Sequence, residues 1–362
     1  MNIGYRGLIA PITPKKQLNF KNYKIMKKIF CAVLALAAMA SCSKEYTVDY
    51  NKQAIAFGDV FVDNATRADY SDGQDLTQFN VYGIVKGTAG TVNIFAGIPV
   101  TGSVGPNVWS YDEQYAQYWI PGADYDFAAV VDADGVGTST SAATFGMPTT
   151  LTSTADANGV RKDLLYAEGH VDDAIANQVP VNFTFNHLLS KVHFTVTSNA
   201  QGGYYHTVTG ISVSNFKSGT FTLDNAITPA TIDGGTWAAS NDDDNKKDVP
   251  FAEIANVTAA TGGMTNADML LVPNADAFNV TFTVDLYKDG TKLGTETHEN
   301  IPVTIKDGEN VVGLQKGHAY NFVIACSVGN PIQFSVTDDP EWANGNTTDT
   351  NDDTVNDSVV VQ

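Results

Sequence analysis

Cysteine, charged residues and helix-forming patterns are all scarce in this chain. Three cysteines occur among 362 residues, and their spacing does not match a zinc site. Charged residues make up 17% of the chain, against about a quarter in typical soluble proteins. Stretches with the period of an amphipathic helix are nearly absent. These shortages exclude a helical bundle and an α/β nucleotide-binding fold.

Motifs of catalysis and of nucleic-acid binding are missing as well. The chain has no Gly-x-Ser-x-Gly elbow, phosphate-binding loop, dinucleotide fingerprint or His-Glu-x-x-His motif. Its six histidines are scattered, and its net charge of −19 excludes nucleic acid as an expected partner. We therefore expect no enzyme, no cofactor and no metal. An enzyme whose catalytic residues meet only through tertiary contact stays open as a third-ranked alternative.

Alternating apolar and polar residues recur along the chain, separated by Gly, Asn and Asp. A period of two is typical of half-buried strands, and the 31 glycines suit many short strands and turns. The sequence predicts an all-β fold of antiparallel β-sandwiches. The expected strands cover residues 53–62, 78–85, 91–98, 126–131, 179–185, 191–197, 207–213, 220–223, 279–286, 301–305 and 320–326.

Several connections between these strands are also predicted. Asp289-Gly290 marks the tip of a hairpin over residues 287–293. Polar stretches at 132–162 and 234–248 are expected to be loops, and a domain boundary is placed near 186–190.

The front of the chain differs from the rest in charge and hydropathy. Residues 1–41 hold seven basic and no acidic residues, and an apolar run covers 29–39. Eleven helical residues rise only about 16 Å, too short for a ~30 Å hydrocarbon core. A signal peptide therefore fits better than a transmembrane anchor. With Ala40-Ser41-Cys42 behind it, the segment is similar to a bacterial lipoprotein signal, cut between Ser41 and Cys42 with palmitate on Cys42. An ordinary secretory signal is the alternative.

The end of the chain holds one further cysteine and an acidic tail. Once the signal is removed and Cys42 carries lipid, only Cys326 is left, so no internal disulfide can form. Cys326 lies in the apolar run 322–326 and is expected to be a small buried strand residue. From residue 338 the chain is acidic and low in complexity, which predicts a solvated tail over 338–362.

The first strand after the signal carries the most informative pattern. Ile55, Phe57, Val60 and Val62 make it strongly apolar, and a short polar stretch with Arg67 follows. A trypsin-like protease would find one arginine on an accessible loop there. Cutting the loop would free the strand, and the groove left behind could be refilled by a strand from another chain. The plain alternative is an ordinary strand followed by a solvated loop.

At this point the chain resembles a known family, the fimbrillins of Bacteroidetes, which are major and minor subunits of type V pili. The resemblance covers residues 26–337 and rests on the order of several motifs. Aromatic residues of the two tryptophan motifs among them are expected to lie in the core. The motifs are Ala40-Ser41-Cys42, Ile55-Ala56-Phe57-Gly58, Thr66-Arg67-Ala68, and residues 76–83, 109–111, 118–122, 125–129, 163–167 and 181–192.

The resemblance implies two tandem transthyretin-like β-sandwich domains, at 42–186 and 187–337, after removal of residues 1–41. It implies a lipoprotein of the outer membrane and cell surface, anchored through lipid on Cys42. An arginine-specific protease is expected to cut between Arg67 and Ala68 and so to displace the strand that carries Ile55, Phe57, Val60 and Val62. The emptied groove would then take a C-terminal strand of a neighbouring fimbrial subunit.

The C-terminus departs from the family pattern, because some twenty residues follow Trp342. Either residues 332–336 together with 359–361 form the donor strand, or the chain is an accessory or tip subunit that donates nothing. Thr354 and Ser358 lie in Asp-Ser/Thr-apolar sites similar to those that Bacteroidetes O-glycosylate.

Several questions stay open at the level of sequence. The alternative function is an anchored surface adhesin or glycan-binding lipoprotein that does not polymerise. The sequence does not decide whether the subunit is a stalk, anchor or tip subunit, or which host or glycan ligand it binds. It also does not decide whether the chain starts at Met1 or at Met26.

Overall fold

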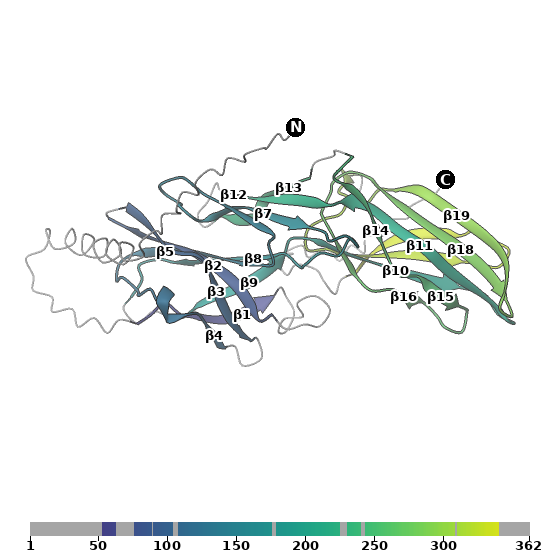
Figure 1. Ribbon diagram of the computed structural model, residues 1–362, viewed down its shortest axis with the longest axis horizontal. Coiled ribbons are helices and arrows are strands. Elements are labelled where there is room, and N and C mark those ends of the chain that lie inside the picture. Colours follow the sequence, from purple (N-terminus) through teal and green to yellow (C-terminus); the bar gives the residue numbers. More distant parts are fainter. Residues whose placement is uncertain are drawn as a thin grey trace, which may run out of the picture. The chain divides into compact units, whose positions relative to one another are not determined.

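The computed structural model describes residues 53–62, 76–88, 90–103, 108–175, 179–224, 230–239, 243–307 and 310–339, all within one compact unit, Tyr50–Gln362. Strands dominate these ranges (Figure 1), and their one helical element is the short 3-10 helix η2, Glu113–Tyr115. No helix within the described ranges is long and apolar enough to cross a membrane. The predicted all-β fold is confirmed.

A seven-stranded sheet contains most strands of the first half. Its order is β1-β9-β8-β5-β2-β3-β4, and its neighbours run antiparallel except β1 and β9, which are parallel. The strands are β1 (Phe57–Val62), β2 (Gln78–Gly87), β3 (Gly90–Ser103), β4 (Val108–Ser110), β5 (Asp124–Val131), β8 (Leu165–Val171) and β9 (Val181–His187).

Strand β5 lies between two hydrophobic cores, which explains its composition. Every residue after Asp124 is buried. Tyr125 and Phe127 belong to an aromatic core on one face of the sheet, whereas Ala128 and Val130 belong to a second core on the other face. A strand covered on both faces needs apolar residues at nearly every position.

A four-stranded sheet in the order β13-β12-β7-β6 covers the second core (Figure 1). Its inward side chains Leu151 and Phe221 pack with Ile84, Val130 and Tyr166 of the seven-stranded sheet. The strands are β6 (Gly135–Thr138), β7 (Pro148–Thr154), β12 (Ser218–Asp224) and β13 (Thr231–Ala238).

Strands β6 and β7 lie inside residues 132–162, so the loop predicted there is wrong over both strands. In β7, threonines alternate with the buried Leu151 and Ser153, and the strand pairs with β6 on one side and β12 on the other. Threonine is branched at Cβ and favours strands, but its polarity resembles that of a loop. The second predicted loop, 234–248, is wrong at both of its ends, because β13 continues to Ala238 and β14 begins at Lys246.

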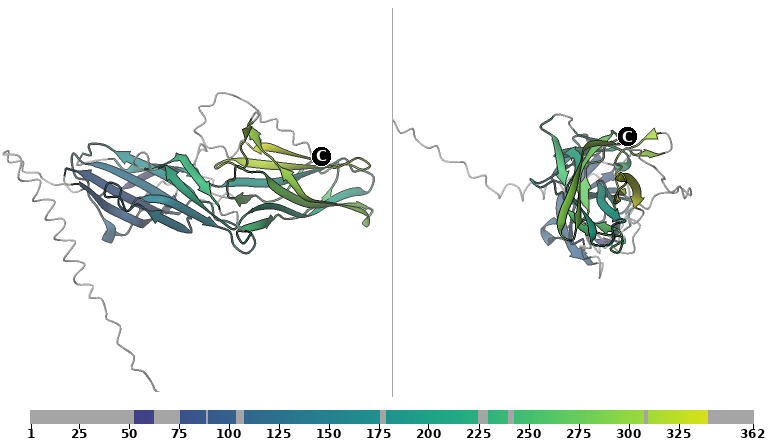
Figure 2. Two further views of the ribbon diagram at one scale, coloured as in Figure 1. Left: turned by 90° about the horizontal axis from the view of Figure 1, so that it is seen from above. Right: turned by 90° about the vertical axis from the view of Figure 1, so that its right-hand side faces the viewer.

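Two five-stranded sheets share a third core over much of the remaining chain (Figure 2). One has the order β16-β10-β22-β23 with β17 also on β10, and the other has β14-β11-β18-β19 with β15 also on β11. A separate pair is formed by β20 and β21. The strands are β10 (Ser190–Ser198), β11 (Tyr204–Phe216), β14 (Lys246–Pro250), β15 (Ile254–Val257), β16 (Met264–Thr265), β17 (Met269–Leu271), β18 (Phe278–Lys288), β19 (Thr291–Val303), β20 (Lys306–Asp307), β21 (Asn310–Val311), β22 (Ala319–Cys326) and β23 (Gln333–Asp339).

The chain passes between these two halves more than once. After β9 it forms β10 and β11 in the C-terminal sheets, then returns to form β12 and β13 beside β7, and leaves again to form β14. Strand β12 therefore pairs with β7, on the other side of the boundary expected at 186/187, and β13 pairs with β12 in the same sheet. The two-domain division stays a prediction, and the sheets do not separate at a single point in the chain.

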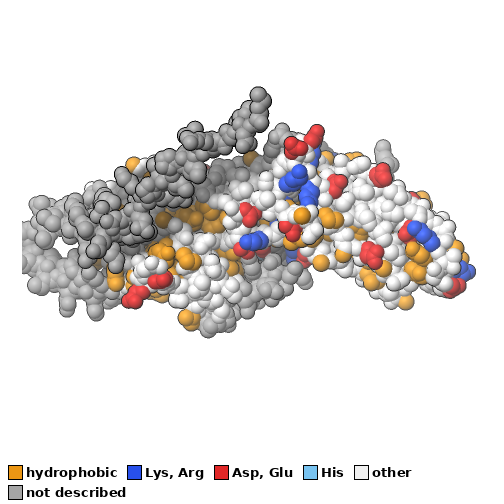
Figure 3. Space-filling view, viewed as in Figure 1, with side chains coloured by type: hydrophobic (Ala, Val, Ile, Leu, Met, Phe, Trp, Pro, Cys, Tyr) orange, Lys and Arg blue, Asp and Glu red, His pale blue; other side chains and the backbone are white. Residues whose placement is uncertain are grey.

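Two local predictions are confirmed. The turn between β18 and β19 has Asp289 at φ 46° and Gly290 at φ 81°, as the tight Asp-Gly hairpin requires. Cys326 is a buried free cysteine in β22, and burial raises the pKa of its thiol to about 12. On the face drawn in Figure 3, uncharged side chains cover most of the described surface and the charged ones form small groups, in keeping with the low charge content.

Candidate assembly site around the first strand

The first strand is part of the aromatic core. Ile55, Phe57, Val60 and Val62 are each at most 4% exposed, while Phe61 between them faces outward and is 40% exposed. Apolar residues therefore alternate with outward-facing ones along β1, apart from one irregularity.

Phe57 occupies the centre of this core. Its ring lies 5.7 to 6.5 Å, centroid to centroid, from five other aromatic rings, which come from four other strands and from the segment after β4. Burying such a ring contributes about 1.5–3 kcal/mol, and favourable ring pairs add to it. The five rings are those of Phe79, Phe95, Tyr111, Phe127 and Phe183.

One edge of β1 pairs with β9. The pairing is parallel, with Phe57 opposite Val181 and Val62 opposite Phe185, and a bulge separates Phe57 from Val60. Gly58 lies at this bulge, where a Cβ atom would be 2.6 Å from Oδ1 of Asn182. The Asn182 side chain also accepts a 2.9 Å hydrogen bond from the backbone N–H of Asp59.

The other edge of the first strand is bonded to the segment that follows β4. The N–H of Ile55 donates to the carbonyl oxygen of Gln117 at 2.8 Å, and the N–H of Trp119 donates to that of Gln53 at 3.4 Å. The hydroxyl of Tyr111 donates to the carbonyl oxygen of Ile55 at 2.5 Å. Burial raises the pKa of Tyr111, so its hydroxyl keeps the proton that it donates.

Residues 53–62 include β1 at one end of the seven-stranded sheet, and these contacts join them to the segment that follows β4 at the other end. Removal of residues 53–62 would leave one edge of β9 unpaired, the carbonyl of Gln117 without its donor, and a gap where Phe57 lies. Unpaired backbone groups next to an apolar groove form a template for another strand. The chemistry of this site is therefore strand binding.

Sequence reasoning missed three residues of this site: Tyr111, Gln117 and Asn182. The aromatic residues of the two tryptophan motifs were expected in the core. Trp109 and Trp119 are buried, at 7% and 5% exposure, and Tyr111 packs partly buried against the core. The prediction is wrong for Tyr118, which is 45% exposed. Tyr111 lies in the same motif as Trp109, and a hydroxyl within an aromatic cluster was the available signal for a bond to a buried backbone group.

The other predicted site residues lie outside the described residues. They are the signal cleavage and lipidation residues Ser41 and Cys42, the maturation cleavage residues Arg67 and Ala68, and the glycosylation candidates Thr354 and Ser358.

Comparison with known proteins identifies the family. A family profile described as fimbrillin-like matches residues 66–339. The chain belongs to the fimbrillin-like family. The matched range begins one residue before Arg67 and does not include β1. Membership supports a fimbrial, cell-surface role for this fimbrillin, in association with other fimbrial subunits, and indicates a structural protein rather than an enzyme.

Comparison with solved structures finds chains of similar fold. A fimbrial protein of Bacteroides vulgatus is 17% identical with a TM-score of 0.54, over 79% of this fimbrillin and 98% of that chain. The fimbrial anchor protein of Porphyromonas gingivalis is 13% identical with a TM-score of 0.33, over 76% and 95% of the two chains. No curated protein sequence matches this fimbrillin.

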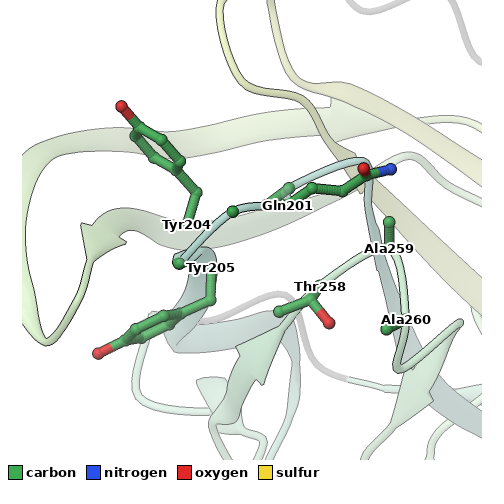
Figure 4. A pocket seen from close by; sticks show the side chains of 9 residues that line it. Gln201, Tyr204, Tyr205, Thr258, Ala259 and Ala260 are labelled. Atoms are coloured by element: carbon green, nitrogen blue, oxygen red, sulfur yellow. The ribbon is translucent and has the colours of Figure 1, made fainter.

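A hollow of about 520 Å³ lies at the turns that precede β11 and follow β15 of this fimbrillin. In Figure 4 the rings of Tyr204 and Tyr205 point away from Ala259 and Ala260. Tyr205 stacks on Tyr287 at 5.0 Å, and the ammonium of Lys288 lies 4.7 Å from the Tyr204 ring. Both rings thus contact side chains of the chain itself.

Within the described ranges, no group of three or more His, Cys, Asp or Glu residues is placed to hold a metal ion.

Proposed function

We propose that this fimbrillin is a structural or accessory subunit of a type V fimbrium, exported as a lipoprotein and assembled by protease-triggered strand exchange. The observation that carries the proposal is the burial of β1 in a core built by strands from residues 78 to 187. A strand close to the amino end of the exported chain completes that core, and Arg67 follows it by five residues.

The energetics explain why cleavage would trigger assembly. Ordering a strand of about eight residues costs roughly 1–2 kcal/mol per residue in backbone entropy. Burying four apolar side chains, as residues 55–62 do, returns about 1.5–3 kcal/mol each, so these two terms nearly cancel. Each buried backbone group without a partner costs about 1–3 kcal/mol, and a strand in the groove satisfies a row of them. The emptied groove therefore favours any matching strand.

The lipid anchor and the cut have separate consequences in this scheme. Lipid on Cys42 holds the precursor at the outer membrane, and a cut between Arg67 and Ala68 severs β1 from the rest of the subunit. The freed subunit can then bind a strand of its neighbour in the place of β1.

Strand β23 is the donor candidate among the described residues. It forms an edge of its sheet, pairs only with β22, and buries Phe334 and Val336 at 5% and 6% exposure. The predicted donor segment 332–336 overlaps it, whereas residues 359–361 lie outside the described residues. An accessory or tip subunit would keep β23 in place.

The test compares the parent with Arg67→Ala and Arg67→Lys. Treatment with an arginine-specific protease should give a ladder of denaturant-resistant oligomers from the parent only, with Ala68 as the new amino terminus. A protease that also cuts after lysine should restore oligomers of the Arg67→Lys variant. Polymerisation of Arg67→Ala at the rate of the parent would contradict the mechanism. An uncut Arg67–Ala68 bond in the form found on cells, with a blocked Cys42, would support the anchored adhesin.

A further inference from the structure

A cleft of about 540 Å³ opens beside β13, away from the strand-binding site. The partly exposed Trp237 and Val312 provide apolar surface, and the polar residues Asn274, Asp276, Gln315 and Lys316 also line it. An apolar wall with a few convergent polar groups, in a volume between about 300 and 1,000 Å³, is typical of small-molecule sites.

The aromatic wall of this cleft is held rigidly. The indole Nε1–H of Trp237 donates a 2.8 Å hydrogen bond to the carbonyl oxygen of Leu188, and the indole lies 5.5 Å from the ring of Phe221. The ring stays partly exposed. Because its N–H is already bonded, the indole offers a ligand apolar ring surface.

The polar wall is also preformed. Asn274 and Leu314 exchange two backbone hydrogen bonds of 2.9 Å, which join the two loops that carry the polar residues. Gly313 makes this approach feasible, because it has φ 61° and a Cβ atom there would lie 1.9 Å from the carbonyl oxygen of Asn274. The N–H of Gln315 donates to the hydroxyl of Tyr320 at 3.1 Å. The backbone of this wall is therefore ordered before a ligand binds.

The charges of the lining balance one another. Asp276 is an exposed carboxylate and Lys316 a half-buried ammonium, and the amides of Asn274 and Gln315 add neutral donors and acceptors. A ligand with a strong charge of either sign would meet one repulsive partner. A ligand with many hydroxyl groups can donate to the carboxylate and accept from the ammonium at once.

We propose that this cleft binds a neutral saccharide. The apolar C–H face of a sugar ring packs against Trp237, and its hydroxyls bind Asp276, Gln315 and Lys316. The site shares no residue with β1 or its partners, so it gives the subunit an adhesive function that does not depend on strand exchange.

Binding of maltotriose, cellotriose and mannotriose to the purified protein tests this inference. We expect at least one of the three to bind saturably with a dissociation constant of about 1 mM or tighter. Asp276→Ala and Gln315→Ala should each weaken that binding by about tenfold. Asp248→Ala changes an exposed aspartate of β14 outside the cleft and should leave the affinity unchanged. Amide resonances of residues 235–239, 274–276 and 312–316 should shift on binding.

Several outcomes would overturn the inference. The inference is wrong if none of the three sugars binds saturably at concentrations up to about 10 mM. It is also wrong if the protein binds a peptide or an acidic sugar but no neutral sugar. Equal affinities of Asp276→Ala and the parent would place the sugar elsewhere. The same titration with Arg67→Ala should give the parent's affinity, which separates this inference from the proposed assembly mechanism.

Discussion

The hydroxyl of Tyr111 donates a 2.5 Å hydrogen bond to the carbonyl oxygen of Ile55, and so joins the segment after β4 to the first strand. Replacing Tyr111 with Phe keeps the ring beside Phe57 and Phe95 but removes this bond. We expect a loss of about 0.5–1.5 kcal/mol in the free energy of unfolding. Hydrogen exchange should accelerate at the amide of Ile55. Tyr205→Phe in the C-terminal sheets should leave exchange at that amide unchanged.

Gly58 tests how closely β1 must approach β9. A Cβ atom at Gly58 would lie 2.6 Å from Oδ1 of Asn182 and 2.9 Å from Cβ of Pro180. Gly58→Val should therefore destabilise the intact chain by about 1–3 kcal/mol, measured by urea unfolding. Gly294→Val is the control, because a Cβ atom there would have no neighbour within 4 Å. Equal stability of the two variants would show that β1 does not pack tightly on β9.

Glu168 should make stability depend on pH. Burial, with the nearby Asp233 carboxylate, raises the pKa of Glu168 to about 7. Its Oε2 atom has no hydrogen-bond partner within the described part of the chain. Between the pKa of an unfolded glutamate and about 7, the folded chain binds more protons than the unfolded chain, so stability falls as pH rises through this window.

Glu168→Gln should remove this pH dependence. The variant should be more stable than the parent at pH 8, by roughly 1–2 kcal/mol after allowance for partial exposure, and equally stable at pH 4. The measurement is thermal or urea unfolding at both values of pH. Glu253→Gln changes an exposed glutamate and should alter neither value. A gain of equal size at pH 4 would assign the effect to packing instead.

Cys326 can report on the departure of β23. It is buried in β22, beside Ala325, which pairs with Gln333 of β23. Burial also raises the pKa of its thiol to about 12, so reaction with a thiol reagent should be very slow in the intact chain. Cleavage after Arg67 should increase that rate severalfold while β23 is exchanged. A rate that stays constant during oligomer formation would contradict donation by β23.

The strands that alternate cleanly were predictable because each has one face on a core and one toward solvent. β9 and β22 are of this kind, and their buried positions follow the period of two. β7 was not predictable in this way, since its outward positions and one buried position are Thr or Ser. Its strand conformation depends on pairing with β12, a partner more than sixty residues away.

At the candidate site, too, the sequence predicts the buried strand but not the residues with which it pairs. The apolar composition of residues 55–62 indicated a buried strand, because local hydrophobicity is visible in the chain itself. Its parallel pairing with β9 and its bonds to Tyr111 and Gln117 join residues far apart in sequence. Such partners follow from the tertiary fold and have no periodic signal.

The return of the chain through β12 and β13 has a mechanical consequence. Three backbone connections, after β9, after β11 and after β13, link the two groups of sheets. A pulling force applied to a fimbrium under fluid flow would thus be divided among three covalent spans in each subunit, rather than carried by one linker. Stretching experiments should show both groups of sheets yielding together.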